Sequence, residues 1–232
     1  MLKVENIKVS YGPSQVLFGV SLDIAAGQAV ALLGRNGMGK TTTIKSIMGA
    51  LRPYEGSISF NSKRIDSLKD YEICRLGFGY VPEGRRIFKH LTVHEQLSAF
   101  VRSRGEGPAW SPDDIYRLFP GLAQRKASAG GLLSGGEQQM LAIGRALVTS
   151  PKLVILDEAT EGLAPMVRET IWSVLAQLKA RGLAILVVDK NVDDVIALVD
   201  HAYILEKGCV AWSGKVSELQ PDDDTHRRLL AI

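Results

Sequence analysis

The sequence has few cysteines, no long hydrophobic run and little net charge, and each shortage excludes a class of protein. Neither of its two cysteines, Cys74 and Cys209, has a Cys or His neighbour at metal-ligand spacing, so we expect structural thiols in a reducing compartment. The longest apolar candidate, residues 183–188, has the length of a buried strand and falls short of the roughly 18 residues of a membrane span. A net charge of +3 is too mild to indicate a nucleic-acid partner.

The remaining composition is that of an ordinary globular protein. Hydrophobic residues make up 46% and charged residues 23% of the 232-residue chain. This length suffices for one large α/β domain or for a core with a smaller subdomain. Residues 1–6 do not resemble a signal peptide, so we expect a chain that is soluble by itself and reaches a membrane only through a partner.

Residues 34–41, with the sequence GRNGMGKT, fit the phosphate-loop pattern G-x-x-x-x-G-K-[ST] without a mismatch. The apolar stretch 29–33 before them predicts a buried strand, and residues 42–48 after them predict a helix. Glycines in such a loop let backbone N–H groups converge on phosphate oxygens, and the helix N-terminus adds its positive dipole end. Lys40 is then expected at the β- and γ-phosphates, and the Thr41 hydroxyl at Mg²⁺.

A second signal is the apolar run 153–156, which ends in Asp157 and Glu158. At the active edge of a central strand, Asp157 would hold Mg²⁺ directly or through water, and Glu158 would polarise an attacking water as general base. A strand-end pair facing solvent would be the simpler interpretation without the phosphate loop. With that loop present, the functional interpretation is favoured.

A third signal is the sequence LSGGEQQ at residues 133–139, followed by a helix predicted at 140–148. Two glycines before a helix can form an anion site from backbone N–H groups, and the Ser134 hydroxyl can add a hydrogen bond. A plain helix N-cap explains the same residues equally well.

The order of predicted elements indicates an α/β fold. Alternation predicts strands at 2–10, 16–24 and 56–60, which we expect to form an antiparallel layer. Residues 92–150 change character and predict a helical subdomain, with helices at 93–101 and 113–119, the second capped by Ser111, and a loop at 102–112. Strands at 153–156 and 184–188, helices at 166–180 and 192–199, and a hairpin around Lys207-Gly208 predict a mostly parallel sheet. The core is thus expected to comprise residues 1–91 and 151–232.

The motifs GRNGMGKT, LSGGEQQ and LVILDEAT, in this order, resemble the ATP-binding-cassette (ABC) ATPase family, and the resemblance covers essentially the whole chain. It implies a phosphate-loop, RecA-like ATPase core with an antiparallel β layer and an inserted helical subdomain. It also implies that two subunits meet head to tail, with ATP between the phosphate loop of one and the LSGGQ-type signature of the other. Ser134, Gly135 and Gly136 would then contact the γ-phosphate bound to the partner.

The resemblance assigns further positions one at a time. Tyr11 lies where the family stacks an aromatic ring on adenine, although a sheet-surface aromatic is the alternative. Val16 would contact the base or the ribose, and Thr42 the α-phosphate. Glu83, in GYVPEG, lies in the loop that contacts Mg²⁺ and senses the membrane partner. The loop residues expected at the nucleotide are Gly34, Asn36, Gly37, Met38, Gly39, Lys40 and Thr41.

Three positions depart from the general pattern of the family. Glu83 stands where Gln is usual, Lys190 where the switch His is usual, and Ala164 where an Asp is usual. The sequences VPEGRRIF, LTV and EGLAP resemble the smaller ATPase subunit of branched-chain or hydrophobic amino-acid importers, the LivF type, in which Gln is common at the switch. We hypothesise that the Lys190 ammonium contacts the γ-phosphate; the alternative is that it points to solvent.

The resemblance implies an ATP- and Mg²⁺-dependent ATPase that powers an importer, for branched-chain or other hydrophobic amino acids, at the cytoplasmic face of the inner membrane. Its expected partners are transmembrane permease subunits, a second ABC ATPase subunit (the same or a related chain) and, indirectly, a periplasmic solute-binding protein. Alternatives are import of a related solute such as urea or a short amide, and a degenerate nucleotide-binding partner subunit. An ABC ATPase without a membrane is disfavoured by the single cassette.

Overall fold

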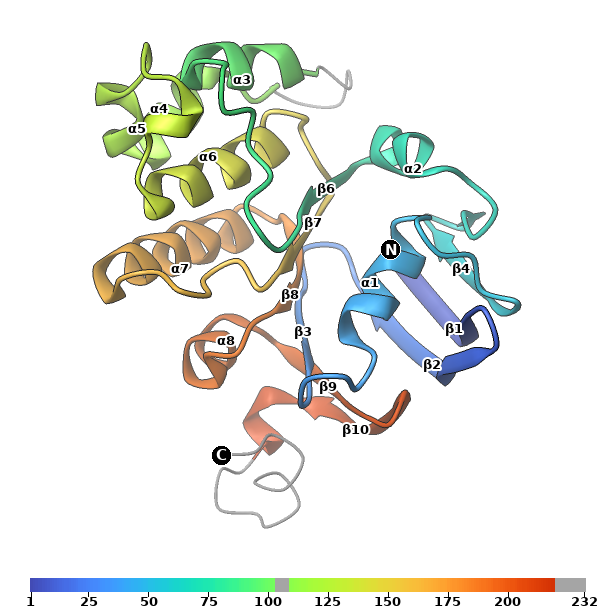
Figure 1. The fold of residues 1–232 in the computed structure, drawn as a ribbon. Helices are drawn as coiled ribbons and strands as arrows, with labels where there is room; N and C mark the ends of the chain where they lie inside the picture. Colours follow the sequence, from blue (N-terminus) through green and yellow to red (C-terminus); the bar gives the residue numbers. More distant parts are fainter. Residues whose placement is uncertain (103–108, 220–232) are drawn as a thin grey trace.

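The structure, a computed structural model, describes residues 1–102 and 109–219. It contains two β-sheets with helices around them (Figure 1). Arg102 and Ala109 flank a segment, 103–108, that lies outside the described residues and contains most of the loop expected at 102–112. His226 and the rest of 220–232 lie outside them too. Within the described residues, no helix is both long and apolar enough to cross a membrane.

The first sheet is antiparallel and has the strand order β2-β1-β4-β5. The slip in the alternation of the first strand proves to be a bulge, because the register shifts between Val4 and Ile7 and Asn6 has φ 49°. The expected antiparallel layer is therefore present. Its strands are β1 (Leu2–Tyr11), β2 (Ser14–Ile24), β4 (Glu55–Phe60) and β5 (Lys63–Arg64).

The second sheet has the order β10-β9-β3-β8-β7-β6, and all its neighbouring strands are parallel except β10 and β9. Those two form the predicted hairpin, with Lys207 and Gly208 at φ 49° and 76° in the turn. Every residue of β3, β7 and β8 is buried, as expected for a parallel sheet covered on both faces. The strands are β3 (Ala29–Leu33), β6 (Phe78–Val81), β7 (Leu153–Asp157), β8 (Ala184–Val188), β9 (His201–Glu206) and β10 (Cys209–Lys215).

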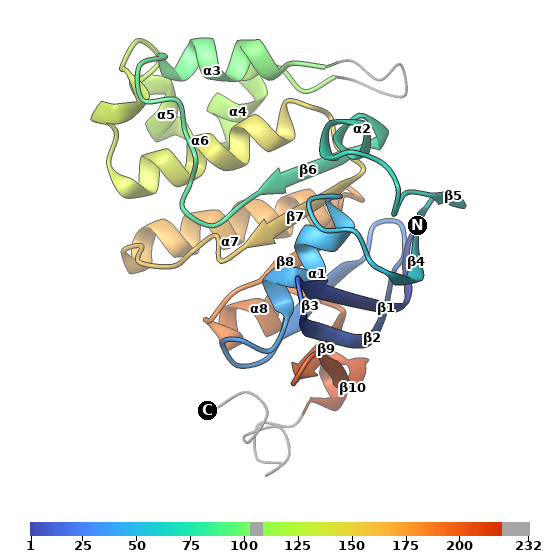
Figure 2. The same cartoon turned by 45° about the vertical axis from the view of Figure 1, so that its right-hand side comes forward.

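Helices cover both faces of this sheet, and each face packs into its own hydrophobic core. Successive side chains of β3 point to opposite faces, so they alternate between the two cores. Ala29, Ala31 and Leu33 pack with helices of the later chain, whereas Val30 and Leu32 pack with α1 and the antiparallel sheet. Helices α3 to α6 gather at one end, next to β6 and α7 (Figure 2). The helices are α1 (Lys40–Ile47), α2 (Asp70–Leu76), α3 (Val93–Phe100), α4 (Pro112–Leu118), α5 (Pro120–Gln124), α6 (Gly135–Leu147), α7 (Pro165–Ala180) and α8 (Val192–Leu198), with 3₁₀ turns at Gly130–Leu132 and Val216–Glu218.

Helix α6 corrects one expectation, because it begins at Gly135 and not at residue 140. Ser134 is its N-cap, and its Oγ accepts from Glu137 N at 3.3 Å while Glu137 Oε2 accepts from Ser134 N at 2.7 Å. This capping box shows that Gly135 and Gly136 form the first turn of the helix and do not precede it. The predicted Ser111 cap of α4 is confirmed.

Candidate functional site

Most of the predicted site residues lie at one edge of the parallel sheet. β3, β8 and β7 are neighbours, and parallel strands bring their carboxyl ends to the same edge. The phosphate loop follows β3, Asp157 ends β7, and Lys190 comes two residues after β8. Ligands of open α/β sheets bind at this edge, so the fold positions the phosphate loop beside two carboxylates.

The phosphate loop depends on its glycines. Gly34, Gly37 and Gly39 have φ 128°, 80° and 103°, conformations that other residues rarely adopt. A Cβ added to Gly34 would lie 2.4 Å from Leu205 O, so the backbone of the hairpin leaves no room for a side chain there. The close approach of β9 therefore fixes the start of the loop.

Lys40 lies against this loop and is only 8% exposed. Its Nζ donates to Gly34 O at 2.7 Å and to Arg35 O at 3.0 Å. Burial lowers the pKa of Lys40, while Glu158 and Asp157 oppose this effect. The ammonium thus lies within the curve of the loop, where it can exchange carbonyl oxygens for phosphate oxygens.

Two pockets of about 300 and 250 Å³ adjoin the loop. The larger one brings Tyr11 and Val16, the expected adenine contacts, into one pocket with Glu158, and Lys190 lines the smaller one. The Met38 side chain is directed elsewhere, since its Sδ accepts from Lys207 N at 3.1 Å. The first pocket is lined by Tyr11, Val16, Asn36, Gly37, Gly39, Lys40, Thr41, Thr42 and Glu158, and the second by Leu33, Gly34, Arg35, Asn36, Lys40, Asp189, Lys190 and Val192.

Asp157 is a buried carboxylate with an oxygen that is available to a cation. It is 1% exposed, and its Oδ1 has no hydrogen-bond partner. Burial raises the pKa of Asp157, the nearby Glu83 raises it further, and Lys40 opposes both. Burial also raises the pKa of the adjacent Tyr80 to about 12. An unpaired buried oxygen next to the phosphate loop fits Mg²⁺, bound directly or through water.

Glu158 is held in an uncommon backbone conformation, with φ 52°. Its N–H donates to Val188 O at 2.7 Å, which fixes it against the end of β8. Lys190 Nζ lies 3.2 Å from Glu158 Oε2 and also donates to Glu161 Oε1. Burial raises the pKa of Glu158, and Glu161 adds to this rise while Lys190 opposes it. One carboxylate oxygen from each of Glu83, Glu158 and Glu161 lies within 4.8 Å of the other two.

A hydrogen-bond network that the sequence did not reveal joins the loops after β7 and β8. Asp189 Oδ2 accepts from Thr160 N at 3.0 Å and from Thr160 Oγ1 at 2.7 Å. Asn191 Nδ2 donates to Thr160 Oγ1 at 3.0 Å, and Arg168 donates to Asn191 Oδ1 at 2.7 Å. Asp189 and Thr160 are buried in this network, whereas Asn191 and Arg168 are partly exposed. The network holds the residues on both sides of Lys190, whose ammonium faces Glu158 and Glu161.

The signature residues Ser134, Gly135 and Gly136 do not lie beside the phosphate loop of their own chain. They begin α6, which lies with α3 to α5, whereas the loop lies between β3 and α1 (Figures 1 and 2). A Cβ added to Gly135 would lie 2.7 Å from Arg85 Nη1, so the Arg85 guanidinium rests against the signature. Sequence analysis missed this contact, although the pair Arg85-Arg86 is conspicuous in the sequence.

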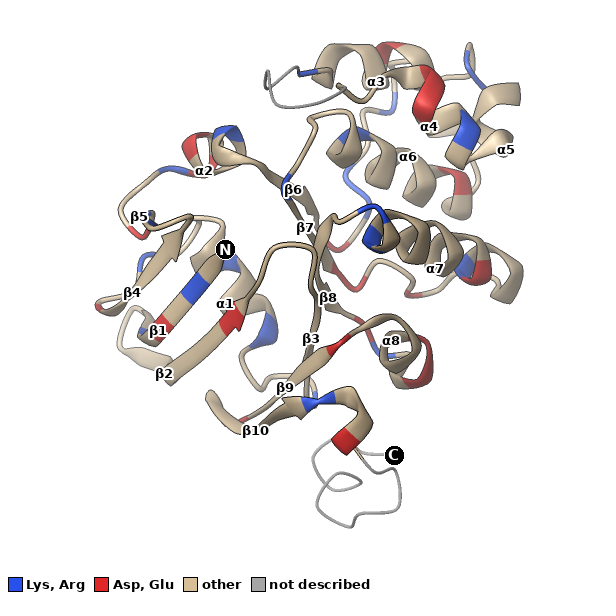
Figure 3. Cartoon of the chain, turned by 180° about the vertical axis from the view of Figure 1, so that it is seen from behind, with Lys and Arg blue, Asp and Glu red and all other residues tan. Residues whose placement is uncertain are grey.

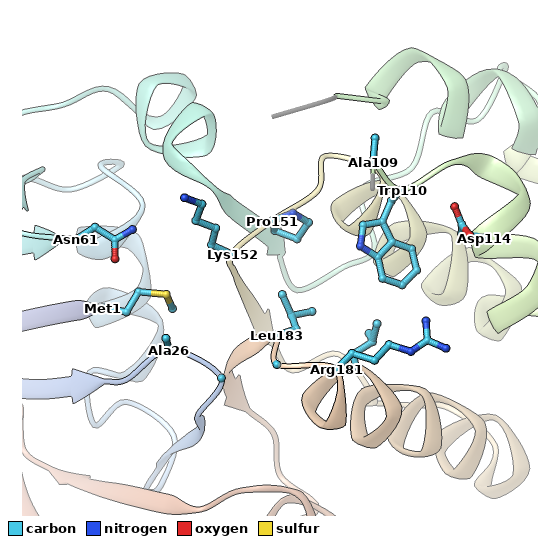
Figure 4. A pocket seen from close by; sticks show the side chains of 13 residues that line it. Met1, Ala26, Asn61, Ala109, Trp110, Asp114, Pro151, Lys152, Arg181 and Leu183 are labelled. Atoms are coloured by element: carbon cyan, nitrogen blue, oxygen red, sulfur yellow. The ribbon is translucent and has the colours of Figure 1, made fainter. Parts of the chain in front are cut away.

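A larger pocket of about 610 Å³ lies at the opposite edge of the sheet, next to the residues that precede β3, β7 and β8. Figure 4 shows Trp110 and Arg181 facing this space from different elements, with Lys152 on the other side. None of the residues predicted for the nucleotide line it. The pocket with the larger volume is therefore not the one beside the predicted nucleotide residues. The phosphate loop lies at the carboxyl ends of the strands, where open α/β sheets bind ligands.

Comparisons with known proteins agree with this geometry. The ABC transporter family matches residues 17–161. The high-affinity branched-chain amino acid transport ATP-binding protein BraG of Pseudomonas aeruginosa is 39% identical over 90% of both chains. A probable branched-chain amino acid transport ATP-binding protein, LivF, of Archaeoglobus fulgidus is 35% identical over 100% of this chain and 99% of its own. The lipopolysaccharide export system ATP-binding protein LptB of Haemophilus influenzae is 32% identical over 98% of this chain and 95% of its own.

Solved structures show the same fold. A nucleotide-free ATP-binding cassette from an ABC transporter superposes with a TM-score of 0.86 at 28% identity, over 100% of this chain and 98% of that one. A dimeric ATP-binding cassette in a post-hydrolysis state, bound to ADP and phosphate, superposes with a TM-score of 0.81 at 25% identity, over 93% and 99%. The second structure is a dimer.

Proposed function

This chain belongs to the ABC transporter family as an ATPase of the LivF type, and we propose that the transporter it powers imports branched-chain or other hydrophobic amino acids. As a member of that family it binds and hydrolyses ATP. The observation that carries the proposal of amino-acid import is the 39% identity to BraG over 90% of both chains. The 32% identity to LptB, an export ATPase, makes export the second candidate. Import of urea or a short amide is a third.

The nucleotide site that we propose uses the two pockets at the phosphate loop. Tyr11 stacks on adenine, Val16 contacts the base or the ribose, and Thr42 binds the α-phosphate. Backbone N–H groups of the loop residues 34–41 surround the β- and γ-phosphates, and Lys40 leaves the loop carbonyls to bind them.

Glu158 acts as general base in this proposal. As the oxygen of water bonds to the γ-phosphorus, the bond from that phosphorus to the bridging oxygen of ADP breaks, and Glu158 accepts the proton of the water. The raised pKa of Glu158 strengthens it as a base. Mg²⁺, held by Thr41 and Asp157 with Glu83 nearby, would neutralise phosphate charge. Lys190 turns its ammonium to the γ-phosphate, which it can do from the wall of the smaller pocket.

A second ATPase subunit completes each site in this proposal. Ser134, Gly135 and Gly136 begin α6 away from the loop of their own chain, which supports a role toward a partner's γ-phosphate. The backbone N–H groups of that first helical turn are free of helical partners and suit an anion. Permease subunits receive the motion through the loop at Glu83 and the helical subdomain 92–150. A periplasmic binding protein delivers the solute, and the assembly is at the inner membrane.

Uptake measurements test the transported solute. In cells from which this gene has been deleted, uptake of radiolabelled leucine and isoleucine should fall and should return with a wild-type copy. A Glu158→Gln copy should not restore it. Unchanged leucine uptake together with lost urea uptake, or with a defect in an exported lipid, would contradict the amino-acid proposal and favour the corresponding alternative.

A further inference from the structure

The ammonium of Lys190 joins two carboxylates of unequal exposure. Lys190 Nζ lies 3.2 Å from Glu158 Oε2 and makes a second, short ion pair with Glu161 Oε1. The Glu158 side chain is 13% exposed, whereas those of Glu161 and Lys190 are 44% and 46% exposed. One cation therefore connects the shielded carboxylate proposed as base to an exposed carboxylate in the loop that follows it.

Hydrogen bonds hold the backbone next to both members of this ion pair, while the exposed side chain of Lys190 extends from it. Asp189 binds Thr160 N and Oγ1 at 3.0 and 2.7 Å, and Asn191 N donates back to Asp189 Oδ1 at 3.0 Å. Lys190 and Glu161 are the residues adjacent to these anchors. The flexible four-carbon stem of Lys190 can still redirect the ammonium without any change in the loops.

The balance of charge changes when a triphosphate enters the site. Glu83, Glu158 and Glu161 place three carboxylates within 4.8 Å of one another, and Lys190 is the cation paired with two of them. Lys190 also lines the pocket that contains Lys40 and the phosphate-loop backbone. A γ-phosphate there adds negative charge within reach of the same ammonium. Of the two existing pairs, the one with Glu161 is the more exposed to solvent, so water and salt screen it more than the pair with Glu158.

We propose that Glu161 is a positioning residue that holds Lys190 against Glu158 before ATP binds and loses it to the γ-phosphate afterwards. The γ-phosphate and the Glu161 carboxylate thus compete for one ammonium. ADP has no γ-phosphate and does not compete. The inference rests on the proposed nucleotide site and adds a residue to it.

Glu161→Gln tests the competition, because it removes one competitor and keeps the shape of the side chain. Calorimetric titration with Mg²⁺ should give a dissociation constant for AMP-PNP, a non-hydrolysable ATP analogue, that is about two- to fivefold lower than in wild type. The constant for ADP should not change. Glu169→Gln, the same substitution at an exposed position on α7, should alter neither constant. An unchanged or weaker affinity for AMP-PNP in Glu161→Gln would overturn the inference.

Two further variants separate competition from simple repulsion and from misfolding. In a Lys190→Gln background, Glu161→Gln should no longer tighten AMP-PNP; equal tightening with and without Lys190 would mean that Glu161 only repels phosphate. Glu161→Asp keeps the charge. Its ratio of the dissociation constants for ADP and AMP-PNP should therefore stay closer to the wild-type ratio than that of Glu161→Gln does. Failure of the wild type to bind AMP-PNP would contradict the proposed function itself, which distinguishes the two failures.

Discussion

Lys40 is the residue of the phosphate loop whose loss should weaken ATP binding most. Its ammonium is directed into the loop by Gly34 O and Arg35 O, and charge-assisted hydrogen bonds to phosphate contribute about 1.5–3 kcal/mol each. Lys40→Ala should therefore raise the dissociation constant for ATP at least about tenfold for each such bond. Titration of ATP into both proteins measures this.

Lys63→Ala is the matched control, since Lys63 is exposed on β5 and lines neither pocket at the loop. The control should bind ATP as the wild type does. Tight ATP binding by Lys40→Ala would mean that the loop binds phosphate through its backbone alone.

Asp157→Asn should stabilise the protein when Mg²⁺ is absent. The buried Oδ1 has no hydrogen-bond partner, and leaving such a group unsatisfied costs about 1–3 kcal/mol, more when it is charged. Because the pKa of Asp157 is raised above its ordinary 3.8, the folded state binds the proton more tightly than the unfolded state does. The carboxylate is therefore destabilising above its folded pKa, and the penalty disappears as the pH falls below 3.8.

Urea unfolding at several pH values with EDTA measures this effect. The difference in unfolding free energy between Asp157→Asn and wild type should be positive at pH 7 and should shrink toward pH 4. Asp113→Asn, at a side chain that is 78% exposed, should change stability by less than about 0.5 kcal/mol. A less stable Asp157→Asn at neutral pH would show that the carboxylate is satisfied in solution.

The sequence was sufficient to predict some of the site's residues and not others. Lys40 could be found because its motif is contiguous, and Glu158 because it follows an apolar run whose strand carries it to the same edge. The contact of Glu161 with Lys190 spans 29 residues of sequence and depends on how two loops pack. The contact between Arg85 and Gly135 joins the loop after β6 to the start of α6. No local pattern encodes such pairs.

At the scale of elements, the packing of α6 against α3 and α4 is sensitive to a single methyl group. A Cβ on Gly144 would lie 2.6 Å from Ile115 Cγ2 and 3.1 Å from Leu97 Cδ2. Ile115 is β-branched and fully buried, so it cannot easily give way. Gly144→Ala should lower the free energy of unfolding by about 1–3 kcal/mol, as overpacked cores do.

Gly121 on α5 is the matched control, because a Cβ there would meet nothing within 4 Å. Gly121→Ala should be neutral or should stabilise by up to about 1 kcal/mol through helix propensity. Urea unfolding of the two variants measures both effects. Equal stabilities would contradict the tight packing of α6 on α3 and α4.

At the level of elements, hydrophobic periodicity was a reliable guide and helix starts were not. Helices α3, α7 and α8 and all strands except β5 and β6 were predicted, because their apolar spacing is regular. The start of α6 was placed too late, because two glycines conceal a first turn that the Ser134–Glu137 capping box stabilises. Glycine propensity and capping oppose each other there, and capping prevails.

For the whole molecule, the strand order β10-β9-β3-β8-β7-β6 could not be predicted, since it depends on pairing between distant segments. Neither sign of charge dominates, because the net charge is only +3 and residues of both signs occur along the chain in Figure 3. Assembly is therefore expected to depend on specific contacts and on bound ATP. In the proposed arrangement, a second chain supplies the signature that lies apart from this chain's own phosphate loop.

The most direct measurement is Mg²⁺-ATP turnover of wild type and Glu158→Gln, with the mass of each followed by light scattering. The wild type should hydrolyse ATP. Glu158→Gln should bind ATP, lose turnover by about 10²- to 10⁴-fold, and show an ATP-dependent mass twice that of one chain. Hydrolysis by Glu158→Gln at the wild-type rate would contradict the assignment of Glu158 as the base.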